Sequence, residues 1–186
     1  WTIAVFLLLC FILRVQWPTW RQAGHQMVTG LLLHGVYLGG VFAAIKWGMP
    51  AGITAIVVGI QPLLTALLGW RLFGDNLLPR QWLGLALGLI GVTVVILSTR
   101  GYGHFDLTVP ALAATLIALA AIAIGTVYQK RFGGGANLVA SSLWQYVSTA
   151  LFMGILTYSF ETRVVVWDTQ LIFALAWLVL GLSVSA

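Results

Sequence analysis

The sequence predicts an all-α membrane protein, a polytopic bundle of transmembrane helices. Of the 186 residues, 61% are hydrophobic and only 7% are charged, whereas a soluble domain carries about 25% charged residues. The charges also leave long uncharged runs, each sufficient to cross a hydrocarbon layer about 30 Å thick as a helix. These runs cover residues 22–45, 47–70, 81–99, 107–129, 132–160 and 169–186. A water-soluble fold is therefore excluded.

The expected elements follow these runs in order. The first run, residues 1–13, makes only ~20 Å of helix, so we expect the second half of a span there. Full spans are expected at residues 24–46, 51–71, 81–98, 108–129, 138–159 and 169–186. Because residue 1 is not Met and no polar flank follows the last run, we expect the chain to be a piece of a longer protein.

The charged residues are divided unequally between the two sides that these spans define. One side receives Arg14, Arg21, Arg71, Arg80, Lys130 and Arg131 with a single acid, Asp75. The other side receives Lys46, Arg100 and Arg163 with Asp106, Glu161 and Asp168. The positive-inside rule places the first side in the cytoplasm and predicts a multi-pass protein of the cell (inner) membrane. One or two basic residues per loop do not form a nucleic-acid surface.

Two stripes of small residues predict close helix packing. Gly84, Gly88 and Gly91 share one face of the span at 81–98, and the first two match the G-x-x-x-G spacing. Ala114, Ala118, Ala121 and Gly125 form a second stripe on the span at 108–129. Both stripes are expected to contact neighbouring helices.

A weak internal repeat is also present. A shift of 146 residues places Ala4 on Ala150, Phe6 on Phe152 and Gly35 on Gly181. Spans separated by this offset are five spans apart, and an odd number reverses their direction in the membrane. Inverted repeats of this kind build many secondary transporters, so the helices at 24–46 and 169–186 are expected to occupy equivalent positions.

Two stretches resemble EamA-type permeases of the drug/metabolite transporter superfamily. They are "GITAIVVGIQPLLTALLGWRLFGDNLLPRQWLGLALGLIGVTVVIL" and "DLTVPALAATLIALAAIAIGTVYQKR". The resemblance implies ten helices in two inverted five-helix repeats, of which the chain holds about helix 2 to helix 8. Residues 1–98 would belong to the first repeat and residues 107–186 to the second. Where the family usually has Leu-Gly-Glu, this chain has Phe73-Gly74-Asp75.

The pair Gln61-Pro62 lies in the middle of a span and is the main candidate for a solute contact. Pro62 lacks an N–H and clashes with the carbonyl of Val58, so a backbone oxygen should be freed at mid-membrane. Such a group is tolerated only inside a protein bundle or beside a watery cavity. A packing kink, with Gln61 bonded to another helix, is the alternative reading.

The remaining candidates for the solute path are polar or aromatic residues inside other spans. They are His34, Tyr37, Trp144 and Gln145. Each could instead bond a neighbouring helix, and that alternative stays open. The imidazole of His34 needs a partner in lipid and can titrate near neutral pH.

No enzyme motif, metal site or cofactor site is found in the sequence, so we expect no catalysis, no metal and no cofactor. Two functions remain. The first is a secondary transporter that exports a small organic solute, such as an amino acid, a metabolite or a drug-like compound, by alternating access. The second is a non-transporting membrane scaffold that binds partners. The expected partners are the solute and the lipid bilayer, without nucleic acid, and a homodimer is left open.

Overall fold

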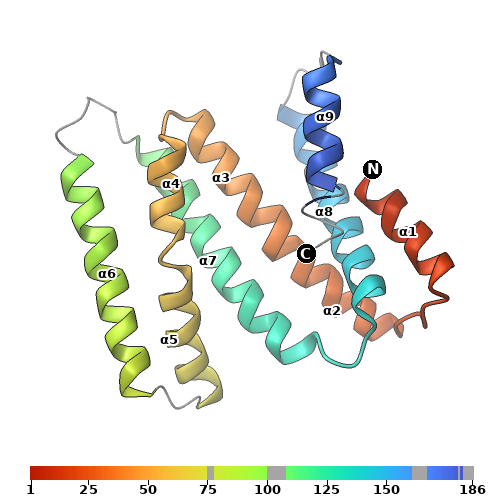
Figure 1. Ribbon diagram of the computed structural model, residues 1–186, viewed down its shortest axis with the longest axis horizontal. Helices are drawn as coiled ribbons and strands as arrows, with labels where there is room; N and C mark the ends of the chain where they lie inside the picture. Colours follow the sequence, from red (N-terminus) through yellow and green to blue (C-terminus); the bar gives the residue numbers. More distant parts are fainter. Residues whose placement is uncertain (75–77, 100–107, 161–166, 180, 182–186) are drawn as a thin grey trace. The chain divides into compact units, whose positions relative to one another are not determined.

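The computed structural model describes residues 1–74, 78–99, 108–160, 167–179 and 181, and these residues confirm the all-α class (Figure 1). Five charged residues used in the sidedness prediction lie outside the described part of the chain. They are Asp75, Arg100, Asp106, Glu161 and Arg163. The end of the last expected span, residues 182–186, lies outside it as well.

The helices match the expected spans closely. Their bounds are α1 Thr2–Ile12, α2 Trp20–Gly30, α3 Tyr37–Lys46, α4 Ala51–Val58, α5 Gln61–Phe73, α6 Pro79–Thr99, α7 Val109–Phe132, α8 Leu138–Phe160 and α9 Thr169–Trp177. Among the described residues, the stretches Trp20–Lys46, Ala51–Phe73, Val109–Phe132 and Leu138–Phe160 are long and apolar enough to cross a membrane.

Local chemistry explains where several helices begin and end. α2 begins at a capping box, in which the Thr19 hydroxyl and the Gln22 side chain each bond the other residue's backbone N–H. α5 ends at Gly74, whose φ of 69° is in the left-handed region that glycine adopts at low cost. α9 begins where the Asp168 carboxylate accepts a hydrogen bond from the Leu171 N–H at 2.7 Å.

The span Trp20–Lys46 contains a feature that the sequence did not predict. Its middle, Leu31–Val36, is a π-helix, labelled η1, that joins α2 to α3. A π-helical turn holds one more residue than an α-helical turn, and such turns often mark functional positions.

The chain divides into two compact units, each with its own helix contacts. One unit is Trp1–Leu31 with Gly133–Ala186, and the other is Leu32–Phe132. In the first unit α8 packs against α1 and α2, and in the second α7 packs against α3, α4 and α5. This division is defined by contacts between helices, whereas the expected repeats, 1–98 and 107–186, are defined by the order of the spans along the sequence. The repeats therefore stay a prediction.

The two small-residue stripes differ in the structure. A Cβ added at Gly125 would lie 2.8 Å from Leu33 Cδ2, and one added at Gly40 would lie 2.9 Å from the Ala114 carbonyl oxygen. The stripe on α7 is thus confirmed as a packing face. A Cβ added at any of the three glycines of the α6 stripe would meet nothing within 4 Å.

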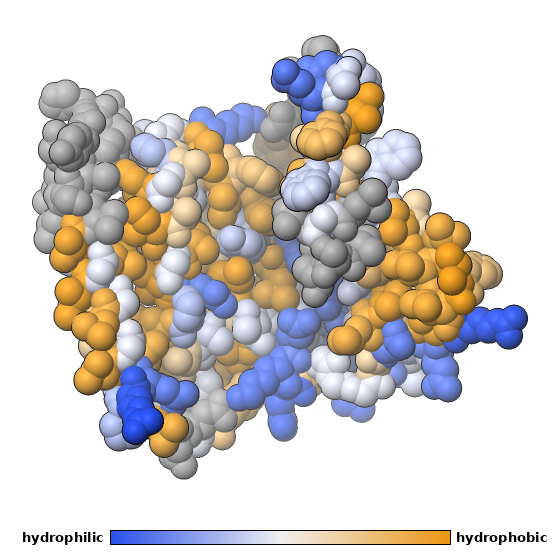
Figure 2. All heavy atoms as spheres, in the orientation of Figure 1, coloured by the Kyte–Doolittle hydropathy of each residue, from blue (hydrophilic) through white to orange (hydrophobic). Residues whose placement is uncertain are grey.

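The prediction of close packing is therefore wrong for the α6 stripe in the described part of the chain. Its first two glycines, Gly84 and Gly88, instead line a cavity of about 160 Å³ beside the junction of α4 and α5. Figure 2 shows mainly apolar residues on the visible side of the coloured part of α6, with hydrophilic residues at the end where the helix begins.

Candidate functional site

The span Ala51–Phe73 breaks in the middle, between α4 and α5. The last bonds of the first half run from the Gly59 N–H to the Ala55 oxygen and from the Ile60 N–H to the Val57 oxygen. α5 begins at Gln61, and Pro62 is its second residue. The Val58 carbonyl accepts no hydrogen bond from the described part of the chain. The freed backbone oxygen predicted from Pro62 is therefore present, at a helix break.

Gln61 lies directly after this break and faces α7. Its side-chain Nε2 donates to the Thr65 and Thr126 hydroxyls, in both cases at 3.4 Å. These distances are at the long end for hydrogen bonds, and Gln61 is only half-buried. Its Oε1 receives no hydrogen bond from the described residues, although an amide oxygen can accept two.

A groove of about 390 Å³ runs between α5 and α7 beside Gln61. Its wall on α5 repeats every four residues, which places the side chains on one helix face. Its lining residues are Gln61, Pro62, Thr65, Ala66, Gly69 and Phe73 from α5, with Thr126, Val127 and Lys130 from α7. The groove thus combines an amide, two hydroxyls and an amine with apolar walls.

The Lys130 end of the groove lies at the expected cytoplasmic side. Lys130 Nζ is 5.6 Å from the centroid of the Phe73 ring, so the last turns of α5 and α7 adjoin. The beginning of α7 lies near the end of α3, because the Thr108 hydroxyl donates to the Trp47 carbonyl at 3.1 Å. Lys46 is therefore at the opposite end of this unit, as the charge pattern predicts.

The other predicted path residues are placed in two different regions. His34 lies in η1 and Tyr37 begins α3; both are half-buried and neither lines the groove beside Gln61. Trp144 and Gln145 lie on α8, in the other compact unit. The structure thus brings Gln61 and Pro62 together in one groove, while a path that includes the other four residues stays a prediction.

Gln145 makes a short structural contact through its side-chain donor. It is buried, and its Nε2 donates to Gln26 Oε1 at 2.8 Å, while Gln26 Nε2 donates to the Gly133 carbonyl at 3.4 Å. Trp144 packs edge-on against Trp20 with 6.3 Å between ring centroids. Its Nε1 is buried without a hydrogen-bond partner among the described residues.

Two groove residues, Thr126 and Lys130, were not singled out from the sequence. Both lie on α7 four residues apart, so they share a face. This spacing of a threonine and a lysine at the end of a span is the sequence feature that could have indicated the groove. Gln26, the partner of Gln145, was also missed, because nothing local in the sequence shows which glutamines meet.

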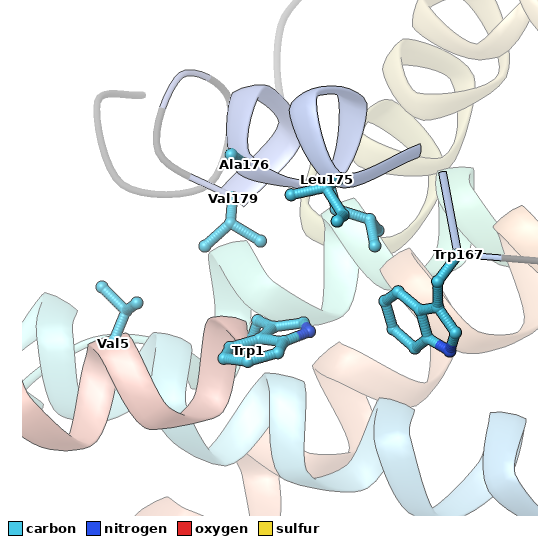
Figure 3. Close-up of a pocket in the computed structure, with 7 residues that line it drawn as sticks. Trp1, Val5, Trp167, Leu175, Ala176 and Val179 are labelled. Atoms are coloured by element: carbon cyan, nitrogen blue, oxygen red, sulfur yellow. The ribbon is translucent and has the colours of Figure 1, made fainter. Parts of the chain in front are cut away.

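A larger cavity of about 520 Å³ lies between α1 and α9 in the first compact unit (Figure 3). Its lining residues are Trp1, Val5, Trp167, Ile172, Leu175, Ala176 and Val179. Apart from the two indole N–H groups, these side chains offer a polar solute no hydrogen bond. No group of three or more His, Cys, Asp or Glu residues able to hold a metal is found within the described residues.

Apolar spans, a break within one of them and a polar groove beside it place the chain among multi-pass membrane proteins, and these features are common in transporters. The EamA-like transporter family matches residues 1–97. The chain belongs to this family, whose name denotes transporters rather than enzymes, and it is a multi-pass protein of the inner membrane.

Several relatives are similar to the chain over part of their length. "Uncharacterized inner membrane transporter YedA" of Escherichia coli (strain K12) is 32% identical over 154 residues, covering 81% of this chain and 48% of the relative. "Probable amino-acid metabolite efflux pump" of Salmonella typhimurium is 35% identical over 91 residues, covering 49% of this chain and 30% of the relative.

A further relative is "Uncharacterized transporter YvbV" of Bacillus subtilis, which is 31% identical over 144 residues, covering 70% of this chain and 46% of the relative. The chain therefore spans half or less of the length of the curated relatives it matches. No solved structure gives a significant match.

Proposed function

We propose that the intact protein exports a small organic solute, of the amino-acid or related metabolite class, and that the solute passes beside Gln61. The observation that carries this proposal is the α5–α7 groove, where a half-buried amide, whose oxygen no described residue bonds, lies next to a broken span. A relative named as an amino-acid metabolite efflux pump supports the solute class. The Gln61 Oε1 suits an ammonium or amide N–H of such a solute.

Alternating access is the mechanism that we propose for this export. The span Trp20–Lys46 changes packing partner along its length: α2 packs against α8, whereas α3 packs against α7. η1 lies between these two parts, where a π-helical turn can absorb a change of direction. This arrangement favours a helix that bends as the solute site opens alternately to each side.

The proposal is tested with Gln61→Leu in the full-length protein, reconstituted in vesicles and assayed for efflux of a panel of labelled amino acids. We expect the variant to insert and remain folded, because leucine suits lipid and packing, but to lose efflux of the solute that the native protein exports. Addition of unlabelled solute to the opposite side should accelerate exchange by the native protein, because a loaded carrier that reorients faster than the empty one returns sooner to the labelled side.

A matched variant separates a solute contact from a structural kink. Pro62→Ala restores an N–H that can bond the Val58 oxygen, so it straightens the span without removing the amide. If Gln61→Leu transports normally while Pro62→Ala misfolds, the pair is structural. Absence of efflux by the native protein for every solute would favour the non-transporting scaffold.

A further inference from the structure

A second polar cavity, of about 380 Å³, lies in the first compact unit and plays no part in the proposed path. It is formed by the connection from α1 to α2 and the connection from α7 to α8. Its lining residues are Leu13, Arg14, Val15, Gln16, Trp17, Pro18, Gln22, Gly135, Ala136 and Asn137.

The two connections are fixed to each other by Gln22. The side-chain Nε2 of Gln22 donates to the Gly135 carbonyl at 3.3 Å, and its Oε1 accepts from the Thr19 N–H at 2.9 Å. Val15 packs against the buried cluster that contains Phe6 and Leu143. The walls of the cavity are therefore part of the folded unit.

Arg14 has an unusual backbone conformation for its residue type. It ends α1 with φ of 48°, and the Val15 N–H bonds the Cys10 oxygen while the Arg14 N–H bonds the Phe11 oxygen. This is the Schellman arrangement, in which glycine usually occupies the left-handed position because it has no Cβ. An arginine in this conformation destabilises the helix end relative to glycine. This cost indicates that the arginine side chain has a role.

Among the described residues, the wall of the cavity carries a single charge. Arg14 is the only Arg, Lys, Asp or Glu among its lining residues. Asp168, the one acidic residue among the described residues of this unit, does not line the cavity. A bound anion would therefore meet the Arg14 guanidinium without competition from a carboxylate on the cavity wall.

The surroundings of the cavity match the interface between headgroups and hydrocarbon. Trp17 lines it and Trp20 follows, with exposures of 58% and 86%, and tryptophan is enriched at this depth of a bilayer. The last turn of α1 carries the exposed apolar side chains Phe11 and Ile12, exposed by 78% and 65%. An acyl chain could lie along them with its headgroup at Arg14.

We propose that this cavity binds a phosphate-bearing anion, and that the headgroup of an anionic phospholipid of the cytoplasmic leaflet supplies it. Basic pockets at the cytoplasmic ends of transmembrane helices bind such headgroups through the charge of the phosphate. The guanidinium of Arg14 provides paired donors for two phosphate oxygens. This inference does not depend on transport.

The test uses the full-length protein in nanodiscs that contain phosphatidylglycerol or only phosphatidylcholine, with bound lipid counted by native mass spectrometry. Arg14→Gly keeps the helix end, because glycine adopts the same φ, but removes the guanidinium. We expect it to retain phosphatidylglycerol about fivefold less well, the effect of one basic residue at a charged leaflet. Arg14→Lys should recover part of the retention.

The matched control is Arg21→Gln, which removes an exposed charge in the first turn of α2 that does not line the cavity. It should retain phosphatidylglycerol as the native protein does. Equal losses in Arg14→Gly and Arg21→Gln, or no loss in either, would overturn the proposal. In a separate arm, inorganic phosphate is added. If it displaces phosphatidylglycerol from the native protein but not from Arg14→Gly, the cavity binds phosphate and accepts the free anion as well as the lipid headgroup.

Discussion

Two glutamines in the membrane-spanning part of the molecule, Gln145 and Gln61, have opposite environments. Gln145 is buried and bonds Gln26 at 2.8 Å, and its backbone lies directly against Gly30 of α2. Gln61 is half-buried, makes only bonds of 3.4 Å and lines an open groove. The same type of side chain thus makes a short, buried bond between helices in one unit and long bonds beside an open groove in the other.

The difference teaches how to separate structural from functional polar groups inside a membrane protein. An amide in hydrocarbon must find a partner, and where another side chain satisfies it at short distance, as at Gln145, its removal should affect stability. Where the bonds are long and the side chain lines an open groove, as at Gln61, its removal should affect a ligand more than the fold. Three sites test this comparison, in order of decreasing effect on stability.

The largest effect is expected from Gly30→Ala, where α2 crosses α8. A Cβ at this position would overlap the carbonyl oxygen and Cα of Gln145, and backbone atoms cannot turn aside as a side chain can. We expect the helices to separate at a cost of about 3 kcal/mol or more, seen as a lower melting temperature in detergent. Gly24→Ala on the same helix is the control, because a Cβ there meets nothing within 4 Å.

An intermediate effect is expected from the Gln26–Gln145 pair. Gln26→Leu and Gln145→Leu should each destabilise the protein by about 1–2 kcal/mol, because each leaves the other amide buried without its partner. The double variant should lose less than the sum of the two, and a double-mutant cycle measures the difference. Efflux by folded Gln145→Leu should remain normal; its loss would instead place Gln145 in the solute path, as the sequence predicted.

The smallest effect on stability is expected from Thr126→Val in the groove. The Thr126 hydroxyl donates to the Ile122 carbonyl of its own helix at 2.7 Å and also meets Gln61. We expect stability to change by no more than about 0.5 kcal/mol, while efflux efficiency falls about fivefold because Gln61 loses a positioning contact.

Thr93→Val is the matched control for Thr126→Val. Its hydroxyl bonds its own helix in the same way, to the Leu89 carbonyl at 2.8 Å, but it is exposed and does not line the groove. Equal efflux in the two variants would show that the Thr126 contact with Gln61 has no role in transport.

The sequence by itself determined the spans, the ends of most helices and the break at Pro62. Each depends on interactions within a few residues or on the transfer of side chains from water to lipid, which composition and order along the chain specify. The resemblance to EamA-type permeases could also be recognised from the sequence, because it depends on the order of such local features along the chain.

Only the tertiary structure decided which polar groups are paired and which are free. Gln145 meets Gln26 across 119 positions of sequence and Gln61 meets Thr126 across 65. The α6 glycines, which match a packing motif, have no close neighbour among the described residues. A sequence motif specifies only one face of one helix. Whether this face contacts another helix depends on how the two helices approach each other, which is set by packing along their whole length.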